Sequence, residues 1–186
     1  AKELMIDVLA NTNNYKDAQA MLETLKNPSE NSKRVYPRIL FGRATEMIND
    51  GRLAEADGLL NQVLEDPYNR TVLPYAYFWK GEIGYRNKQL DTAIKYFHAY
   101  MDAGAPTAGE ANPVNAKYNL GYSYLRKENF KVSVTFFEPL IKAPALNTDA
   151  FTQDAYLRTA DNYFMMKNYD KARSMYDQAI KLSWPA

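Results

Sequence analysis

Few residues in this chain are of the types that perform chemistry, and their spacing does not assemble a reactive site. The segment GAPTAGEA (104–111) has the glycine spacing of a phosphate-binding loop, but Glu110 and Ala111 occupy the places where Lys and Ser or Thr would hold phosphate and Mg²⁺. His98 is the only histidine and cysteine is absent, so neither a histidine metal cluster nor a thiol nucleophile is expected. Carboxylates such as Glu110 lack a histidine or cysteine partner for proton transfer. We therefore expect no enzyme activity, no metal and no cofactor, with GAPTAGEA as a connector and His98 as an ordinary residue of a helix surface.

Composition places the chain among folded proteins. It has 186 residues, of which 46% are hydrophobic, and a formal net charge of +1, which suits one compact core or a modest array of repeats and argues against disorder. The near-neutral balance argues against a nucleic-acid partner, because sequence-independent binding to nucleic acid depends on clustered Lys and Arg. No apolar run approaches the ~20 residues that span a bilayer, and no signal-peptide pattern opens the chain. The absence of cysteine leaves the compartment open.

A repeated pattern runs through the sequence at intervals of roughly 37 to 40 residues. In each copy a small residue is followed four positions later by a large apolar one, and a proline follows roughly ten residues after the small one. The small and large pairs are Ala18/Leu22, Ala56/Leu60, Ala93/Phe97, Ser133/Phe137 and Ala172/Tyr176, and the prolines are Pro28, Pro67, Pro106, Pro144 and Pro185. The prolines predict that a helix stops at the end of each copy.

A second small residue lies about a dozen residues before the first one, inside a segment rich in Tyr, Phe and Leu. These residues are Ala44, Gly81, Gly121 and Ala160. A glycine inside a helix costs up to ~1 kcal/mol relative to alanine, so we expect Gly121 to mark a close contact with a neighbouring helix. The segments NDGR (49–52), RNKQ (86–89), RKEN (126–129) and MKNY (166–169) predict a turn between the two helices of each copy. Asp91 and Asp170 are expected to cap the second helices of their copies.

These residues carry a family resemblance. The segment LGYSY (120–124), the pair Ser133-x-x-x-Phe137 and Pro144 resemble the tetratricopeptide repeat (TPR) pattern of Leu-Gly-x-x-Tyr, Ala-x-x-x-Phe and Pro. Residues 73–106 and 152–185 resemble the same pattern, so the resemblance covers nearly the whole chain. It has departures, because Gly84 stands where tyrosine is usual, Lys117 stands where a bulky residue is usual, and the first copy is short.

The resemblance implies an all-α fold, an α-solenoid of about five antiparallel helix pairs in a single TPR array over residues 1–186. The repeats are expected at approximately 3–28, 36–67, 73–106, 113–144 and 152–185. The connectors NPSENSKR, DPYNRTVLP, GAPTAGEANP and KAPALNTDA make the repeat longer than the usual 34 residues. Connectors of this length resemble those of bacterial cell-envelope members, which points to the periplasm or cell envelope of a bacterium.

Members of the TPR family line an inner surface with their first helices and usually receive an extended or helical peptide there. The resemblance therefore implies a non-catalytic scaffold or adaptor that binds a protein or peptide partner in a concave groove. Aromatic and Arg side chains concentrate binding energy at protein interfaces, and the groove-facing positions include several of both. The predicted partner-binding residues are Tyr75, Trp79, Glu82, Arg86, Asn115, Tyr118, Asn119, Tyr122, Arg126, Arg158 and Asp161.

Other interpretations of the same residues stay open. Aromatic residues at helical spacing also serve simply as packing, and Arg86 and Arg126 also suit the end of a helix, where a cation complements the macrodipole. Flat aromatic rings flanked by Asn and Glu suit sugar rings as well, so a carbohydrate-binding module is the alternative function. At the C-terminal end no polar capping helix follows, and Met175, Ala179 and Trp184 are expected to meet a second copy of the chain or further repeats.

Overall fold

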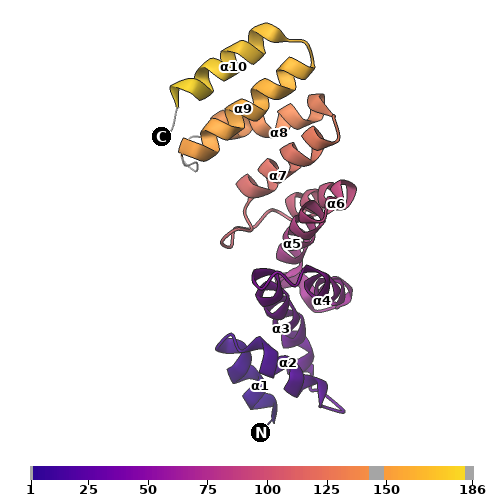
Figure 1. Ribbon diagram of the computed structural model, residues 1–186. Helices are drawn as coiled ribbons and strands as arrows, with labels where there is room; N and C mark the ends of the chain where they lie inside the picture. The colour runs from indigo at the N-terminus through magenta and orange to yellow at the C-terminus, as the bar shows by residue number, and fades with distance from the viewer. Residues whose placement is uncertain (1, 143–148, 183–186) are drawn as a thin grey trace. The chain divides into compact units, whose positions relative to one another are not determined.

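The computed structural model describes residues 2–142 and 149–182. Over these residues the chain forms ten α-helices and a short 3₁₀ helix and contains no β-strand, which confirms the all-α prediction (Figure 1). The helices are α1 (Lys2–Asn11), α2 (Tyr15–Glu23), α3 (Glu30–Asn49), α4 (Leu53–Glu65), α5 (Leu73–Arg86), α6 (Leu90–Asp102), α7 (Pro113–Arg126), α8 (Phe130–Lys142), α9 (Asp149–Met165) and α10 (Tyr169–Lys181), with the 3₁₀ helix η1 at Asn69–Thr71.

The helices belong to two compact units, which are described separately. Unit 1 comprises residues 1–83 and unit 2 comprises residues 84–186, so α5 contributes most of its length to unit 1 and its last turn to unit 2. In unit 1, α3 packs on α2 and α4; in unit 2, α8 packs on α7 and α9, and α9 packs on α10. The boundaries proposed for the individual repeats stay a prediction.

Three-residue turns join the two helices of each copy, and all five have the same geometry. The middle residue of each turn is in the left-handed conformation, with φ between 58° and 75°. The N–H of the following residue then bonds back to a carbonyl of the preceding helix, as in Asn129 N to Tyr124 O at 2.9 Å, which satisfies a carbonyl that the helix end leaves open. The middle residues are Asn13, Gly51, Lys88, Glu128 and Lys167. The turns predicted at 49–52, 86–89, 126–129 and 166–169 are confirmed.

The predicted N-caps of two second helices are wrong. Asp91 and Asp170 lie inside the first turns of α6 and α10, and the cap positions are Gln89 and Asn168. The Asn168 side chain accepts a hydrogen bond from the Lys171 N–H. The N-cap lies earlier than predicted because of the turn. The last turn residue, Gln89 or Asn168, both bonds back to the first helix and serves as the N-cap of the second.

Two connector predictions need correction. The segment NPSENSKR was expected to lie between helices, but α3 begins at Glu30 with Ser29 as its N-cap, where the Ser29 side chain accepts from Ser32 N. The helix continues through Pro37, which the sequence pattern did not anticipate. Connector DPYNRTVLP is partly helical as well, since it contains η1 and the start of α5. Pro28, Pro67 and Pro106 follow the ends of α2, α4 and α6 as expected, whereas Pro144 and Pro185 lie outside the described residues.

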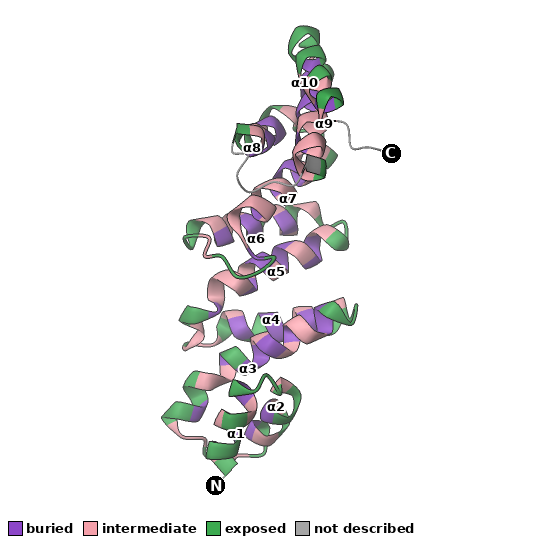
Figure 2. Cartoon of the chain, turned by 90° about the vertical axis from the view of Figure 1, so that its left-hand side faces the viewer, coloured by how far each residue is buried: buried purple, intermediate pink, exposed green. Residues whose placement is uncertain are grey.

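The small residues of the repeated pattern lie where helices approach closely. Ala18, Ala56, Ala93, Ser133 and Ala172 are all buried. The buried positions of each helix lie among intermediate and exposed ones, and exposed residues gather at the turns (Figure 2). In unit 1 an ion pair supplements this packing, because buried Lys80 on α5 donates to Asp57 at 2.6 Å and to Asn61 at 2.7 Å, both on α4.

Gly121 is a contact point, as its position in the pattern predicted. A Cβ atom at this position would lie 2.7 Å from Cε2 of Phe137, a ring of α8 that is completely buried. A polar chain crosses the same place: Ser133 Oγ donates to Gly121 O at 2.8 Å, and Asn162 Nδ2 donates to Ser133 Oγ at 3.0 Å. Helices α7, α8 and α9 therefore meet at a position where only glycine leaves enough room.

Gly121→Ala is expected to destabilise unit 2 by about 1 to 3 kcal/mol, because the buried Phe137 ring has no space into which to move. Urea unfolding followed by circular dichroism measures the change. Gly58→Ala is the matched control, since a Cβ there meets no atom within 4 Å and alanine is the better helix former by up to ~1 kcal/mol. Adding Phe137→Leu to Gly121→Ala should recover part of the loss, and a Gly121→Ala protein as stable as the parent would show that the contact does not explain the glycine.

Candidate functional site

All the predicted partner-binding residues lie on the first helices of their copies. Helix α5 carries Tyr75, Trp79, Glu82 and Arg86; α7 carries Asn115, Tyr118, Asn119, Tyr122 and Arg126; and α9 carries Arg158 and Asp161. Tyr75, Trp79 and Glu82 belong to unit 1 and the others to unit 2. The two groups are therefore described one at a time.

The aromatic residues of the unit 1 group are partly used in packing. The Tyr75 ring lies 6.2 Å from the Phe41 ring of α3, and the Trp79 ring meets the Phe78 ring edge to face at 5.5 Å. Trp79 also packs against the core of unit 1. Tyr75, Trp79 and Glu82 nevertheless keep intermediate exposure, so part of each side chain still reaches solvent.

The unit 2 group converges on one carboxylate. Tyr118 and Tyr122, one turn apart on α7, both donate their hydroxyl hydrogens to Oδ2 of Asp154 on α9, each at 2.6 Å. Their rings pack on each other at 4.9 Å and on Phe137 of α8 at 5.9 and 5.3 Å. Another face of Tyr118 lies against Phe151, with the ring centroids 4.6 Å apart. The two tyrosines thus join α7, α8 and α9.

Arg158 extends this arrangement along α9. Its Nε donates to Asp154 Oδ1 at 3.2 Å, its Nη1 donates to Asp161 Oδ2 at 2.6 Å, and its guanidinium lies 5.8 Å from the Tyr122 ring centroid. Tyr176 of α10 donates to the other oxygen of Asp161 at 2.7 Å. The side chains of Arg158, Asp154 and Asp161 remain 31%, 27% and 32% exposed. The name α7–α9 cluster is used below for Tyr118, Tyr122, Asp154, Arg158, Asp161 and Tyr176.

Burial and carboxylate partners raise the pKa of four tyrosines in unit 2. Burial, followed by the hydrogen bond to Asp154, raises the pKa of Tyr122 to about 12 and raises the pKa of Tyr118 as well. Burial and the bond to Asp161 raise the pKa of Tyr176 to about 12. Burial and the bond to Glu138 do the same for Tyr163. These phenols are hydrogen-bond donors to carboxylates and are held in the protonated form.

The remaining predicted residues serve mainly local purposes. Asn115 lies in the first turn of α7, where its side chain donates to the Glu110 carbonyl at 2.8 Å. Arg86 and Arg126 are the last residues of α5 and α7, in agreement with the interpretation that they complement the helix macrodipole. The Arg126 guanidinium also lies 4.5 Å from the Tyr85 ring centroid. Asn119 is half-buried on α7.

Asp154 was not among the predicted partner-binding residues, and Tyr176 was predicted only as the large residue of the repeated pattern. Asp154 and Arg158 are four residues apart on one helix, which is an ion-pair spacing visible in the sequence. The contact between these two residues could therefore have been predicted. The bonds of Tyr118 and Tyr122 to Asp154 could not have been predicted, because these tyrosines lie 36 and 32 residues before it in the sequence. Tyr176 likewise depends on how α10 packs on α9.

The residues considered for chemistry are used in structure. GAPTAGEA forms the connector between α6 and α7, as predicted, with mutual backbone hydrogen bonds between Ala108 and Ala111. His98 is not an ordinary surface residue, because its ring packs against Tyr124 and Phe136 and its Nε2 lies 3.1 Å from the Tyr124 hydroxyl. Among the described residues no group of three or more His, Cys, Asp and Glu side chains is arranged to hold a metal ion.

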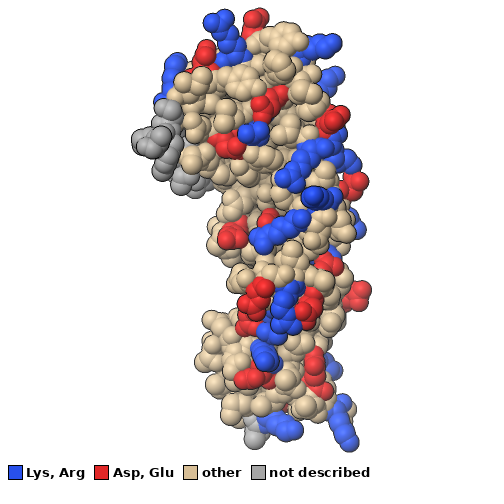
Figure 3. Space-filling view, viewed as in Figure 1, with Lys and Arg blue, Asp and Glu red and all other residues tan. Residues whose placement is uncertain are grey.

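Charged side chains of both signs are interspersed on the visible face of each unit (Figure 3). Within residues 2–142 and 149–182 no helix has the length and apolar character needed to cross a membrane. At the C-terminal end, Ala179 is buried and its carbonyl accepts from Gln153 at 3.0 Å, while Met175 packs against a core cluster of unit 2. Met175 keeps intermediate exposure and Trp184 lies outside the described residues, so the contact of this end with a second copy or further repeats stays a prediction.

Asp154→Ala is expected to lower the free energy of unfolding by about 2 to 3 kcal/mol, because it removes three charge-assisted hydrogen bonds at a partly exposed site. Urea unfolding measures the loss. Asp177→Ala, which removes an exposed carboxylate from α10, is the control and should change stability by less than ~0.5 kcal/mol. In a double-mutant cycle with Tyr122→Phe the effects should not add; additive effects would show that the cluster is not an energetic unit.

Stability is expected to fall as the pH rises from about 10 towards 12. The pKa of an unfolded tyrosine is near 10, whereas burial and the bonds to carboxylates raise the pKa of Tyr122, Tyr163 and Tyr176 to about 12 in the folded chain. The folded chain therefore keeps protons that the unfolded chain releases, so this stabilisation is complete below pH ~10 and is lost above it. Urea midpoints across this range test the trend. Tyr122→Phe should make the decline shallower and exposed Tyr169→Phe should not; equal slopes would contradict the assignment.

Comparisons with known proteins agree with this geometry. Sequence models described as tetratricopeptide repeat match residues 41–108 and 154–183, which together make up more than half of the chain. No curated protein matches the sequence.

Solved structures with the same fold cover almost the whole chain. BtubC from P. vanneervenii is 14% identical with a TM-score of 0.70 over 97% of this chain and 82% of that one. MamA from Desulfovibrio magneticus RS-1 is 16% identical with a TM-score of 0.63 over 97% and 92%, and MamA of AMB-1 is 16% identical with a TM-score of 0.66 over 98% and 96%. At such identities the likeness concerns the fold alone, and it confirms the α-solenoid class. With its repeated small residues, its helix pairs and the two matched stretches, the chain belongs to the tetratricopeptide repeat family of protein–protein interaction scaffolds, whose members are typically non-catalytic.

Proposed function

We propose that this scaffold binds an extended peptide or a partner helix on the face of unit 2 formed by α7 and α9. The observation that supports the proposal is the state of the α7–α9 cluster, whose side chains are fixed by mutual hydrogen bonds while about a third of each charged member remains exposed. A partner that meets fixed side chains loses less conformational freedom on binding than one that must order them. Preorganised Arg and Tyr side chains are also the types that concentrate binding energy.

Arg158 is the central contact in this proposal. A guanidinium has five N–H donors, and the bonds to Asp154 and Asp161 use only its Nε and Nη1 groups. The remaining donors suit a backbone carbonyl or a carboxylate of the partner. Asn119, Tyr122 and Arg126 lie on the same face of α7, three to four residues apart, and would contact the partner beside Arg158.

The other predicted contacts have different weights in the proposal. Tyr118 and Asn115 act mainly within the chain, since Tyr118 packs on Phe151 and Asn115 binds the Glu110 carbonyl. Tyr75, Trp79 and Glu82 stay a separate prediction for unit 1, and Arg86 is the helix-terminal counterpart of Arg126. The carbohydrate-binding alternative concerns Tyr75 and Trp79, whose rings pack beside Phe41 and Phe78 but keep intermediate exposure, and it stays a separate prediction for unit 1.

Site-specific photo-crosslinking tests the proposed face without dismantling the cluster. A peptide selected from a random display library against the whole chain would be bound to two variants, in which p-benzoylphenylalanine replaces either Arg126 or Arg173. Both arginines are exposed, but Arg126 ends α7 whereas Arg173 lies on α10, the second helix of its pair. Crosslinking is expected at position 126 and not at 173. Equal crosslinking at both positions, or crosslinking at 173 alone, would refute the assignment to this face.

A further inference from the structure

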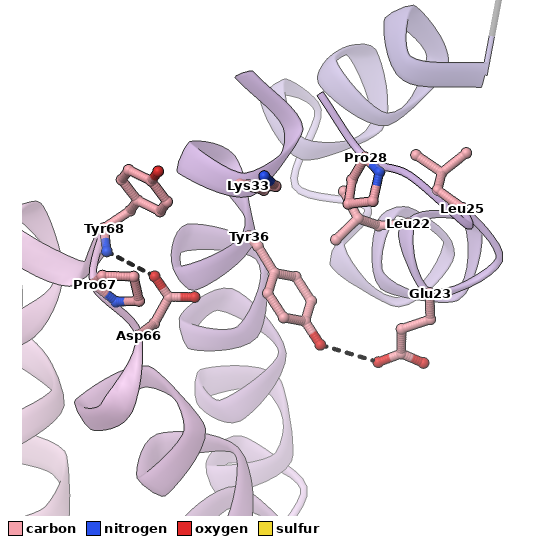
Figure 4. Close-up of a pocket in the computed structure, with 9 residues that line it drawn as sticks. All are labelled: Leu22, Glu23, Leu25, Pro28, Lys33, Tyr36, Asp66, Pro67 and Tyr68. Atoms are coloured by element: carbon pink, nitrogen blue, oxygen red, sulfur yellow. Dashed lines mark hydrogen bonds between the residues drawn. The ribbon is translucent and has the colours of Figure 1, made fainter. Parts of the chain in front are cut away.

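Unit 1 contains a pocket that has no part in the proposal above. Its volume is about 370 Å³, at the small end of the ~300 to 1,000 Å³ typical of ligand sites. Figure 4 shows Tyr36 of α3 between two walls, with Leu22, Leu25 and Pro28 on one side and Asp66, Pro67 and Tyr68 on the other. The remaining lining residues are Glu23 and Lys33. The pocket is thus built from the end of α2, from α3 and from the two connectors that follow α2 and α4.

The connector after α4 is held firmly in place. Asp66 Oδ1 accepts from Tyr68 N at 2.8 Å, and the Asn69 side chain donates to the carbonyls of Val63 and Leu64 at 2.9 and 3.1 Å. The Tyr68 hydroxyl donates to Glu30 on α3 at 2.8 Å. These bonds fix one wall before any ligand arrives, which favours binding.

The charge of the pocket is negative. Glu23 and Asp66 line it with carboxylates, while the Lys33 ammonium is paired with Glu30 at 2.7 Å. Glu23 Oε1 accepts from the Tyr36 hydroxyl at 3.4 Å and from Gln19 at 2.8 Å. Within the described part of the chain, Glu23 Oε2 and Asp66 Oδ2 have no hydrogen-bond donor.

The pKa of Tyr36 reflects the same negative charge. Burial, then the nearby Glu23 carboxylate and the bond to it, and finally Asp66 raise the pKa of its phenol. Both carboxylates therefore act on the Tyr36 phenol, and they lie on opposite sides of its ring (Figure 4). Around the phenol the walls are largely apolar, since they are made of leucine, proline and tyrosine side chains.

We propose that this pocket binds a lysine or arginine side chain, together with an adjoining apolar side chain, from a peptide segment of a protein partner. Two carboxylates suit the cation and the apolar walls suit the aliphatic part of the same side chain and its neighbour. The volume admits one or two side chains but not a helix. The site extends the scaffold function to a second surface and uses a connector that lengthens the repeat, because Asp66, Pro67 and Tyr68 of DPYNRTVLP form one of its walls.

The test uses four probes and the full chain. Acetyl-Leu-Arg-Leu-amide, its Gln and Glu analogues at the central position, and acetyl-Arg-amide would each be titrated into ¹⁵N-labelled protein and followed by NMR. The Arg tripeptide should shift the amides of residues 22–25, Asp66, Tyr68 and Asn69 and bind about fivefold more tightly than the Gln analogue, which is the factor that a partly exposed ion pair supplies. The Glu analogue should bind more weakly still.

Matched variants separate the pocket from general charge attraction. Asp66→Asn keeps an oxygen for the Tyr68 N–H and should weaken the Arg tripeptide about threefold to fivefold, whereas Glu65→Gln removes an exposed neighbouring carboxylate and should not change its affinity. The proposal is overturned if no pocket amide shifts at millimolar peptide, if the Glu analogue binds as tightly, or if acetyl-Arg-amide matches the tripeptide. Pocket shifts that vary with protein concentration alone would assign the pocket to a second copy of the chain instead.

Discussion

The close approach of helices at small residues is the constraint on which the rest of the structure depends. At Gly121 the Phe137 ring occupies the volume that a side chain would need, and at Gly84 an added Cβ would lie 2.9 Å from the backbone nitrogen of Ala93. Two helices can approach to such distances only where one of them presents a hydrogen atom. The approach places the buried Ser133 hydroxyl within reach of the Gly121 carbonyl and of Asn162, and so fixes how α7, α8 and α9 lie on one another in unit 2.

Once these helices are fixed, the exposed sides of α7 and α9 form a defined polar surface. Tyr118 and Tyr122 reach Asp154 because α7 and α9 are held at the distance that packing on α8 dictates. The same side chains therefore stabilise the fold and shape its exposed face. A tyrosine whose ring is buried and whose hydroxyl is bound to a carboxylate keeps its orientation, and a fixed orientation is what a scaffold presents to a partner.

Unit 1 is held together by an ion pair and by hydrogen bonds of its connectors. Its ion pair between Lys80 and Asp57 joins α4 to α5, and its connectors fold back on the helices through Tyr68 and Asn69. The residues that lengthen the repeat are therefore ordered and line a negatively charged pocket. Loops positioned by a rigid framework are common sites of recognition, which is consistent with a second contact surface in this unit.

The sequence alone determined the helical class, the family, the turns and the glycine contact, because these depend on local periodicity and on small residues whose spacing is visible in the chain. It misplaced the caps at Asp91 and Asp170 and the start of α3, since one residue serves both helices of a turn and Ser29 caps earlier than the repeat pattern implies. Only the tertiary structure decided that Asp154 binds two tyrosines and an arginine, that the His98 ring packs on Tyr124 and Phe136, and that a pocket forms between α2, α3 and the connector after α4. These features join side chains from different helices, and their contacts follow from packing geometry that no local pattern encodes.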